Sequence, residues 1–254
     1  MGRIIAIANQ KGGVGKTTTS INLSAALAES GQKVLVIDFD PQGNLSSGLG
    51  VGRNKFEIGV YEMLMGEATF DNIIKKTETD NLWLLPSDMN LSGAEIELLD
   101  VEQREQVLKK CLENVTDDYD FIIIDCPPSL SLLTINALTA ADTVIVPLQC
   151  EYYALEGLSQ VLNTIELVRK RLNPELKLEG VVFTMYDARI NLSDQVIENV
   201  KATLKANIYS TVIPRNVRLA EAPSFGMPVT EYDPSSKGAD AYRRLAIEVI
   251  NYGN

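Results

Sequence analysis

The segment NQKGGVGKTT, residues 9–18, carries the residue types of a phosphate-binding loop at almost the usual spacing. The usual pattern reads G-x-x-x-x-G-K-[ST], whereas here Gln10 holds the place of the first glycine and a second lysine, Lys11, follows it. In such a loop Lys16 reaches the β- and γ-phosphates of a nucleotide, and the Thr17 hydroxyl ligates Mg²⁺. The spacing therefore predicts a nucleoside triphosphate site with an additional cation.

The surroundings of this segment suit a nucleotide-binding loop. Residues 3–8 (RIIAIA) read as a buried strand, and a helix is expected to begin near Lys16, so that the partial positive charge of its N-terminus faces the phosphates. The glycines allow backbone N–H groups to turn toward an anion. A strand–helix turn that merely tolerates glycine is the alternative, and the register of strand, glycines, lysine and threonine argues against it. The expected nucleotide contacts in the loop are Gly12, Gly13, Val14, Gly15, Lys16, Thr17 and Thr18.

Two acidic signals follow apolar strands, as a phosphate-binding loop requires. FIIIDCPPS places Asp125 at a strand end, where a buried carboxylate holds Mg²⁺, usually through water. VLVIDFDPQGN places Asp38 and Asp40 at the end of another strand. We expect Asp38 in the magnesium shell or in strand-end hydrogen bonding, and Asp40 to orient the attacking water. The sequence thus predicts Lys16 and Asp40 as catalytic residues, and Thr17, Asp40 and Asp125 as metal ligands.

The elements that must position these groups alternate between strand and helix. Strands are expected at residues 3–8, 33–38, 82–86, 121–125, 143–147, 178–185 and 211–214. Helices are expected at residues 16–30, 60–76, 102–115, 131–140, 153–172, 193–206 and 239–252. Continuous apolar runs suit strands that are buried on both faces of a parallel sheet. We expect an α/β fold with a doubly wound, mostly parallel sheet flanked by helices, like that of P-loop NTPases, in a single domain over residues 1–254.

The composition excludes several classes of chemistry. Histidine is absent, which removes His-based triads, imidazole acid–base catalysis and His–zinc sites. The three cysteines, Cys111, Cys126 and Cys150, form no C-x-x-C pair, and their odd number suits a reducing, cytoplasmic setting. No apolar run reaches the roughly 18 residues of a membrane span, and no signal peptide is recognisable. No membrane partner is expected.

The charge is large and unevenly distributed. A net charge of −11 should on average repel DNA and anionic lipid. Residues 164–218, however, contain nine Lys or Arg against six Asp or Glu, while the other residues contain fourteen basic and twenty-eight acidic side chains. A basic region in an acidic protein indicates a surface for an anionic partner.

Taken together, KGGVGKTT, DFDPQGN and DCPP resemble the deviant Walker A class of ATPases. Within that class the chain is similar nearly end to end to the ParA/Soj partition proteins, through segments such as QCEYYALEGLSQ (149–160), VIPRNVRLAEAPSFGMPV (212–229) and YDPSSKGADAY (232–242). The resemblance implies Mg²⁺-dependent hydrolysis of ATP and an ATP-dependent homodimer. It also implies that Lys11 is catalytic and binds the nucleotide of the partner subunit, where its charge offsets the repulsion between two facing triphosphates.

The resemblance also assigns the basic region and the base pocket. It implies sequence-independent DNA binding through Arg189 and Arg218, and a pocket for adenine lined by Met185, Pro214, Arg215 and Asn216. Other basic residues that could add to a DNA surface are Arg169, Arg171, Lys201 and Lys205. The implied partner is a ParB-like protein with a basic segment, and the implied location is cytoplasmic and nucleoid-associated.

Two relatives of this function remain open. A membrane-gradient ATPase like MinD ends in a basic amphipathic helix, whereas the tail AYRRLAIEVINYGN contains only Arg243 and Arg244 and reads as a packed helix. A ParA-like ATPase that positions another cargo would have the same site chemistry and differ only in its partner. For the cysteines, the iron–sulfur cluster of nitrogenase iron protein is the alternative, and buried, inert thiols are expected instead.

Overall fold

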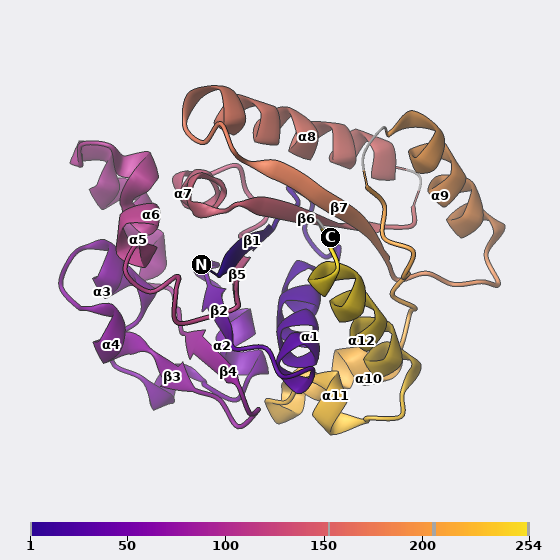
Figure 1. Ribbon diagram of the computed structural model, residues 1–254, viewed down its shortest axis with the longest axis horizontal. Coiled ribbons are helices and arrows are strands. Elements are labelled where there is room, and N and C mark those ends of the chain that lie inside the picture. The colour runs from indigo at the N-terminus through magenta and orange to yellow at the C-terminus, as the bar shows by residue number, and fades with distance from the viewer. Residues whose placement is uncertain (1, 152, 205–206, 253–254) are drawn as a thin grey trace.

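The computed structural model describes residues 2–151, 153–204 and 207–252. Its centre is a seven-stranded sheet in the order β3-β4-β2-β5-β1-β6-β7 (Figure 1). All neighbouring strands are parallel except β3, which pairs antiparallel with β4 at one edge. The strands are β1 (Arg3–Ile7), β2 (Val34–Asp38), β3 (Lys75–Lys76), β4 (Leu82–Leu85), β5 (Phe121–Asp125), β6 (Thr143–Gln149) and β7 (Lys177–Thr184). The expected α/β fold class is confirmed.

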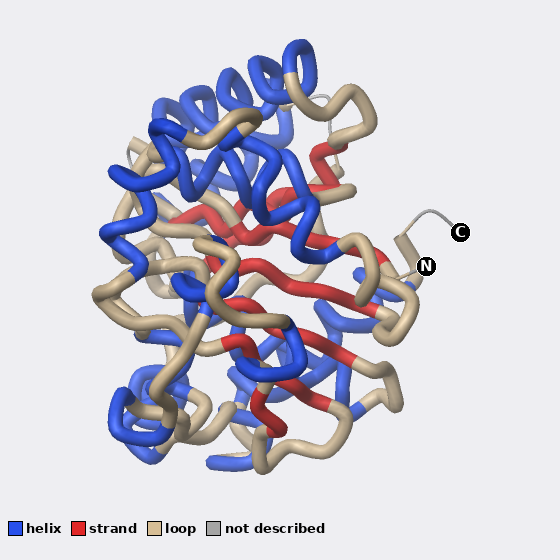
Figure 2. The backbone as a smooth tube through the Cα atoms, turned by 90° about the vertical axis from the view of Figure 1, so that its left-hand side faces the viewer, coloured by secondary structure: helices blue, strands red, loops and turns tan. Residues whose placement is uncertain are grey.

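Helices cover both faces of the sheet. Because successive side chains of a strand point to opposite faces, the apolar strands present side chains on both faces that helices must bury. In β1, Ile5 and Ile7 join the core beneath α1 and α12, while Ile4 and Ala6 join the core beneath α7 and α8. Figure 2 shows the strands between the two helical layers. The longer helices are α1 (Lys16–Glu29), α7 (Leu132–Ala140), α8 (Ala154–Arg171), α9 (Asn191–Thr203) and α12 (Lys237–Ile250). The shorter helices are α2 (Asn44–Gly48), α3 (Val60–Leu64), α4 (Phe70–Ile73), α5 (Leu91–Glu97), α6 (Val107–Leu112), α10 (Val217–Glu221) and α11 (Val229–Tyr232).

Two expected helices are wrong in extent. The segment 60–76 is not one helix: α3 is followed by Gly66, whose φ of 74° is left-handed, and the segment ends in the strand β3. The segment 102–115 is helical only as a 3₁₀ turn followed by α6. Asn136 of α7 accepts a hydrogen bond from the backbone N–H of Leu108 and donates one to the carbonyl of Arg104. A tertiary contact therefore decides where that helix begins.

The expected strand at residues 211–214 is also wrong. The backbone runs extended beside the end of β7, where Ile213 N–H donates to the Phe183 carbonyl at 2.8 Å and Tyr186 N–H donates to the Ile213 carbonyl at 3.0 Å. Arg215 N–H then donates to the Tyr186 carbonyl at 2.9 Å, and this contact completes an isolated parallel bridge between Tyr186 and Pro214 instead of a ladder. This short pairing holds the segment after Pro214 against the carboxyl end of the sheet.

No helix in the described ranges combines the length and apolar composition that crossing a bilayer requires.

Candidate nucleotide site

The loop after β1 has the backbone of an anion cradle. Gly13 and Gly15 have φ values of 75° and 90°, a left-handed conformation that side chains disfavour. Gly15 is the N-cap of α1, and no acidic side chain lies in the first turn of that helix. Thr184 at the end of β7 donates from its hydroxyl to the Val14 carbonyl at 2.8 Å, which fixes the loop to the sheet. The loop therefore presents the positive end of α1 to any bound anion.

Lys16 is held as a buried cation within this loop. Its side chain is only 7% exposed, and Nζ donates to the Lys11 carbonyl at 3.2 Å. Burial lowers the pKa of Lys16, while the negative charges of Asp125 and Asp40 oppose that shift. Within the described residues Lys16 has no carboxylate within salt-bridge distance, so its charge is available to a phosphate.

Asp38 and Asp125 lie side by side, because they are register partners at the ends of β2 and β5. Both are fully buried, and burial raises the pKa of Asp125 to about 6. Burial and the neighbouring Asp125 raise the pKa of Asp38 to about 8. Asp38 accepts hydrogen bonds from the Ser46 backbone N–H and hydroxyl, so of its two expected roles the structure displays strand-end hydrogen bonding.

Oxygen donors that suit magnesium surround Asp125. The hydroxyls of Thr17 and Ser20 each donate to Asp125 at 2.8 Å. In the described part of the chain no group of three Cys, Asp or Glu side chains is arranged to hold a metal by itself. A cation here would depend on the Thr17 hydroxyl, water and phosphate oxygens, which is the way Mg²⁺ binds beside nucleotides, so the residues present fit that ion.

Asp40 lies at the rim of this cluster. It is 8% exposed, its Oδ1 accepts a hydrogen bond from the Gln42 backbone N–H at 2.9 Å, and its backbone N–H points to Asp38. Its negative charge raises the pKa of both Lys16 and Asp125, which places it within electrostatic reach of both groups. Lys16, Asp40 and Asp125, which are distant in sequence, thus lie close together at one edge of the sheet, as the strand-end pattern predicts.

Lys11 has a partner that the sequence analysis missed. Its ammonium forms an ion pair with Glu151, which follows β6, and both side chains remain partly exposed. The backbone N–H of Lys11 donates to Asn9 Oδ1 at 3.0 Å. Within one protomer Lys11 is therefore held at the rim of the loop. No local pattern marks Glu151 as its partner, because the two residues are 140 positions apart.

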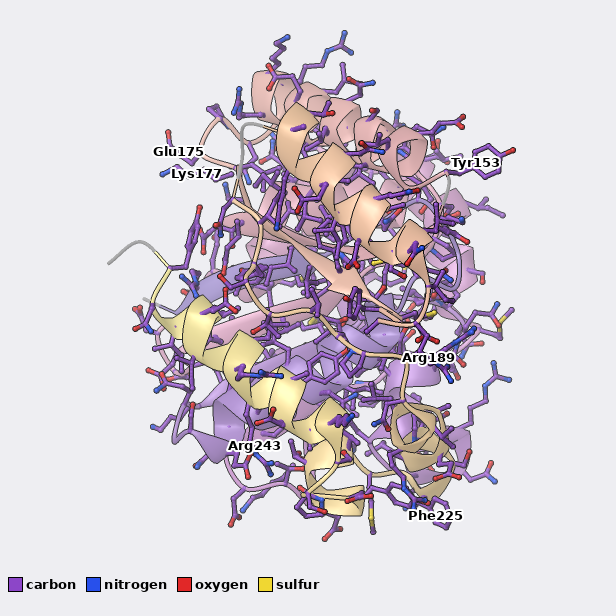
Figure 3. The ribbon with its side chains drawn as sticks, turned by 90° about the vertical axis from the view of Figure 1, so that its right-hand side faces the viewer. Tyr153, Glu175, Lys177, Arg189, Phe225 and Arg243 are labelled. Carbon is purple, nitrogen blue, oxygen red and sulfur yellow. The ribbon has the colours of Figure 1, made fainter. Side chains whose placement is uncertain are left out.

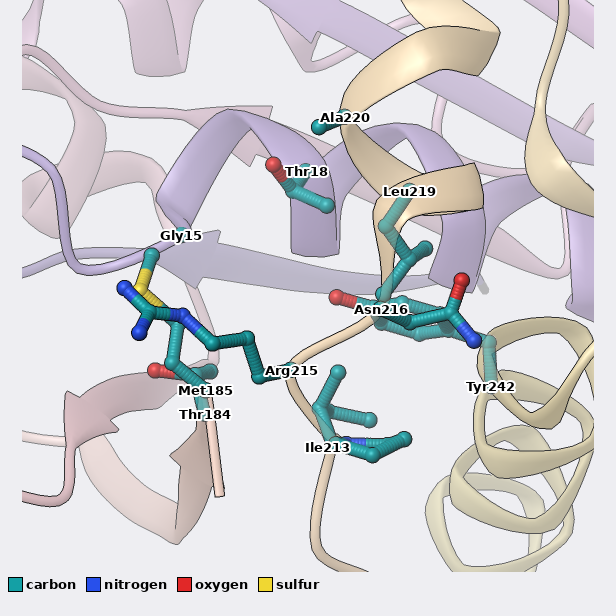
Figure 4. Close-up of a pocket in the computed structure, with 11 residues that line it drawn as sticks. Gly15, Thr18, Thr184, Met185, Ile213, Arg215, Asn216, Leu219, Ala220 and Tyr242 are labelled. Carbon is teal, nitrogen blue, oxygen red and sulfur yellow. The ribbon is translucent and has the colours of Figure 1, made fainter. Parts of the chain in front are cut away.

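The four residues expected at the base pocket line one hollow. Met185, Pro214, Arg215 and Asn216 surround a cavity of about 200 Å³ beside the start of α1. Figure 4 shows the lining residues converging from α1, β7, the segment after residue 213, α10 and α12. Met185 has a φ of 52°, and such backbone strain in a non-glycine residue is frequent at ligand sites. Lining residues that the sequence analysis missed are Thr184, Ile213, Leu219, Ala220 and Tyr242.

Arg189 and Arg218 are exposed and paired with acidic neighbours. Arg189 is 87% exposed and forms a two-pronged hydrogen-bonded pair with Asp187, which holds the pKa of Asp187 below its usual value. Arg218 lies on α10 and contacts Glu221 and Asp233 at 2.8 Å and 3.1 Å. Arg189 follows the carboxyl end of β7, and Leu219 and Ala220, which follow Arg218 in α10, line the hollow beside Met185.

The basic region of the sequence is divided in space. Arg169 and Lys170 pair with Glu166 in the last turns of α8, which leads into the start of β7. Arg189 follows the other end of β7, and Figure 3 shows Arg189 and Lys177 on opposite sides of the molecule. Lys205 lies outside the described residues. The excess of basic residues in the sequence therefore does not form one continuous patch.

The three cysteines have the character of unreactive thiols. Cys126 is buried, and Cys111 and Cys150 are partly buried. Burial raises the pKa of each thiol, to about 11 for Cys150, which disfavours the reactive thiolate.

Comparison with known proteins gives consistent findings. An AAA-domain family model matches residues 2–178. The chain is 59% identical to the sporulation initiation inhibitor protein Soj of Bacillus subtilis, over the full length of both proteins. It is 55% identical to the chromosome partitioning protein ParA of Caulobacter vibrioides, over 98% of this chain and 94% of that protein. A solved structure from Mycobacterium smegmatis, described as cobyrinic acid a,c-diamide synthase with bound ATP analogue and magnesium, is similar with a TM-score of 0.87 and 42% identity, covering 98% of this chain and 95% of that one.

Proposed function

This chain belongs to the ParA/Soj family of chromosome-partitioning ATPases, and we propose that it segregates DNA through a nucleotide-bound dimer that releases its cargo on hydrolysis. The observation that carries this proposal is the convergence of the phosphate loop, the buried pair Asp38 and Asp125, and the hollow beside Met185 at one edge of the sheet. A triphosphate laid along this edge would place its base in the hollow and its γ-phosphate near Asp40.

The proposed site residues divide the work of hydrolysis among them. Residues 12–18 bind the α- and β-phosphates through backbone N–H groups, and Lys16 supplies positive charge to the β- and γ-phosphates. Asp40 holds the attacking water in line with the γ-phosphate. Mg²⁺, held by Thr17 and through water by Asp125 and Asp40, would neutralise charge that develops on the phosphate oxygens. Met185, Pro214, Arg215 and Asn216 position the base.

Lys11 is proposed to couple the nucleotide to the dimer. Two triphosphates facing each other across an interface repel, and a lysine from each protomer offsets that repulsion. Lys11 lies at the rim of the loop and is paired with Glu151, so it must exchange that carboxylate for a phosphate oxygen of the neighbouring subunit.

Replacing Lys11 with alanine should abolish the dimer while nucleotide binding remains detectable, because Lys16 and the loop amides stay in place. The measurement is sedimentation velocity with a non-hydrolysable ATP analogue, beside equilibrium binding of a fluorescent analogue. Lys109→Ala, which removes an exposed lysine from α6, is the matched control and should form the dimer normally. A Lys11→Ala protein that sediments as a dimer at wild-type concentrations would refute the coupling.

The proposed partner of the dimer is DNA bound without sequence preference. Arg189 and Arg218 are exposed, so their pairs with acidic neighbours can exchange for phosphates. Since dimerisation doubles the phosphate contacts, the affinity should depend strongly on nucleotide and on salt.

Replacing Arg189 with glutamate should remove DNA binding and spare the dimer, because this side chain is 87% exposed and supports no packing. The measurement is retardation of plasmid DNA with ATP analogue, together with sedimentation. Arg169→Glu reverses a charge at the other end of the sheet and should retain binding. Wild-type retardation by the Arg189 variant would show that this arginine is not a DNA contact.

The cellular setting follows from the same proposal. A ParB-like partner with a basic segment suits an acidic ATPase, and it would stimulate hydrolysis on the nucleoid. Membrane action like that of MinD is the competing function, and its test is co-sedimentation of the ATP-bound protein with anionic vesicles. The partition function is favoured because relatives 50–59% identical to this chain are named for Soj or ParA.

A further inference from the structure

A lysine-lined hollow lies beside the segment that follows Arg218. It has a volume of about 370 Å³, and its walls include Lys55, Lys75, Lys76 and Phe225. These residues come from three distant segments: the 3₁₀ turn Arg53–Lys55, the edge strand β3 and the 3₁₀ turn Ala222–Phe225. We refer to this feature as the lysine hollow.

Two glycines fix the segments around the hollow against each other. Gly50 and Gly226 also line it, with φ values of 77° and 67°. A Cβ atom on Gly226 would lie 2.7 Å from the Gly50 Cα, closer than real side chains approach. The backbone at Gly50 is therefore packed directly on the backbone at Gly226, which follows Phe225, and this contact gives one wall of the hollow a defined shape.

The charge within the hollow is available to a ligand. In the described residues none of Lys55, Lys75 and Lys76 forms a salt bridge, whereas Arg189 and Arg218 do. Glu78 and Glu231 line the same hollow, and Glu231 accepts a hydrogen bond from the Thr79 hydroxyl. Three cations against two carboxylates, with the exposed Arg53 on the adjoining turn, leave the hollow locally basic in a protein of charge −11.

Contacts connect the hollow to Arg218. Phe225, which is 63% exposed, stacks on Tyr232 with ring centroids 4.9 Å apart. The Tyr232 hydroxyl donates to Glu221 at 3.3 Å, and Glu221 pairs with Arg218. Figure 3 shows Arg189 and Phe225 along the same edge of the molecule. The lysine hollow is therefore linked to Arg218 through Phe225, Tyr232 and Glu221.

We propose that the lysine hollow is a second phosphate-contact surface, which extends DNA binding from Arg218 toward β3. The proposal rests on the DNA binding proposed above. Lysine is a compact charge on a flexible stem, which suits contact with phosphate without reading the bases. Phosphates recur at regular intervals along DNA, so a duplex lying on Arg189 and Arg218 presents further phosphates to cations on the same side.

The test replaces the two most exposed lysines in the double variant Lys55→Gln and Lys76→Gln. DNA binding is measured with a non-hydrolysable ATP analogue across a salt series, and dimerisation by sedimentation. Each dimer would lose up to four phosphate contacts, so the negative slope of log K against log salt should become shallower, its magnitude decreasing by about two to four. The affinity near 0.1 M salt should fall by roughly tenfold or more.

Two companion variants isolate the cause. Lys109→Gln with Lys110→Gln removes two exposed charges from α6 and should leave the slope unchanged. Lys55→Arg with Lys76→Arg keeps the charge and should bind like the wild type. Lysines on an edge strand also discourage pairing with other strands, and a loss of that role would produce aggregation instead of a changed slope.

The outcomes distinguish a failure of this inference from a failure of the proposed DNA binding on which it rests. If the wild type binds DNA and the glutamine variant has the same slope and affinity, the inference is overturned and DNA binding by Arg189 stands. If the wild type does not bind DNA in its ATP state, both proposals fall. If the lysine replacements weaken binding to anionic vesicles but not to DNA, the hollow faces lipid and the inference is overturned.

Discussion

Replacing Asp40 with alanine should slow ATP hydrolysis by about 100-fold or more, the usual contribution of a residue that positions the reacting water. The variant should still bind ATP and form the dimer, because Lys16, Thr17 and Asp125 keep their positions without it. Asp40 contributes one side-chain hydrogen bond to the backbone of Gln42, so its removal leaves the strand end largely intact. Slow hydrolysis with an intact interface should trap the dimer on ATP itself.

The measurements are phosphate release and size-exclusion chromatography with ATP. Asp40→Asn separates charge from shape, since it keeps an acceptor for the Gln42 N–H and should be as slow as the alanine variant. Asp71→Ala removes an exposed carboxylate from α4 and should hydrolyse ATP normally. An Asp40→Ala protein that stays monomeric with ATP would contradict the proposed role.

Replacing Arg3 with methionine should lower the free energy of unfolding by about 3 kcal/mol near neutral pH, the scale of breaking a buried ion pair. Arg3 lies 3.6 Å from Glu179, whose side chain is fully buried, and donates to the carbonyls of Val249 and Tyr252. Glu179 also accepts hydrogen bonds from the hydroxyls of Thr143 at 2.6 Å and Tyr209 at 2.9 Å. Without Arg3 this carboxylate keeps its two hydroxyl donors but loses its only nearby cation in the described structure.

The pH dependence of that loss has a definite sign. Burial raises the pKa of Glu179 in the folded protein above its unfolded value, while Arg3 opposes the shift. A carboxyl whose folded pKa is raised destabilises the fold as pH rises from the unfolded pKa through the folded pKa. Removing Arg3 raises the folded pKa of Glu179 further, so the variant should lose more stability at pH 8 than at pH 5.

Urea unfolding of the Arg3→Met variant and the wild type at both pH values tests this expectation. Asp38 and Asp125 titrate in both proteins, so their contribution cancels in the difference. When the effect of Arg3→Met is measured in a Glu179→Gln background, as the double variant against Glu179→Gln alone, the difference in stability should not depend on pH. An equal loss of stability at pH 5 and pH 8 would mean that Arg3 acts only through the carbonyls at the end of α12.

The arrangement of the candidate site was predictable from sequence because it depends on spacing within short segments. A strand, three glycines, Lys16 and Thr17 in register specify a phosphate loop, and a carboxylate directly after an apolar strand must lie at the carboxyl edge of a parallel sheet. That rule is enough to place Asp38, Asp40 and Asp125 near Thr17, since all four follow strands of the same sheet. The α/β fold class follows from the same alternation of apolar strands and helices.

Tertiary structure alone decided the partners of these groups. Ser46 on Asp38 and Glu151 on Lys11 are contacts between segments whose proximity depends on strand order and loop path, neither of which a local pattern encodes. The extended segment at residues 211–214 is held by hydrogen bonds to β7 across about thirty residues of chain, and its own sequence misleadingly resembles a strand.

The distribution of charge shows the same division. The sequence establishes that residues 164–218 are basic. Arg169, however, lies in the last turn of α8, before the start of β7, whereas Arg189 follows the end of β7, so the two arginines lie at opposite ends of the strands. Conversely, Lys55 and Lys76 lie in an unremarkable part of the sequence, and packing of Gly50 on Gly226 brings them beside Phe225. Sequence determines which charges exist and which loop has the glycine pattern of an anion cradle, whereas the path of the chain through space determines which charges share a surface.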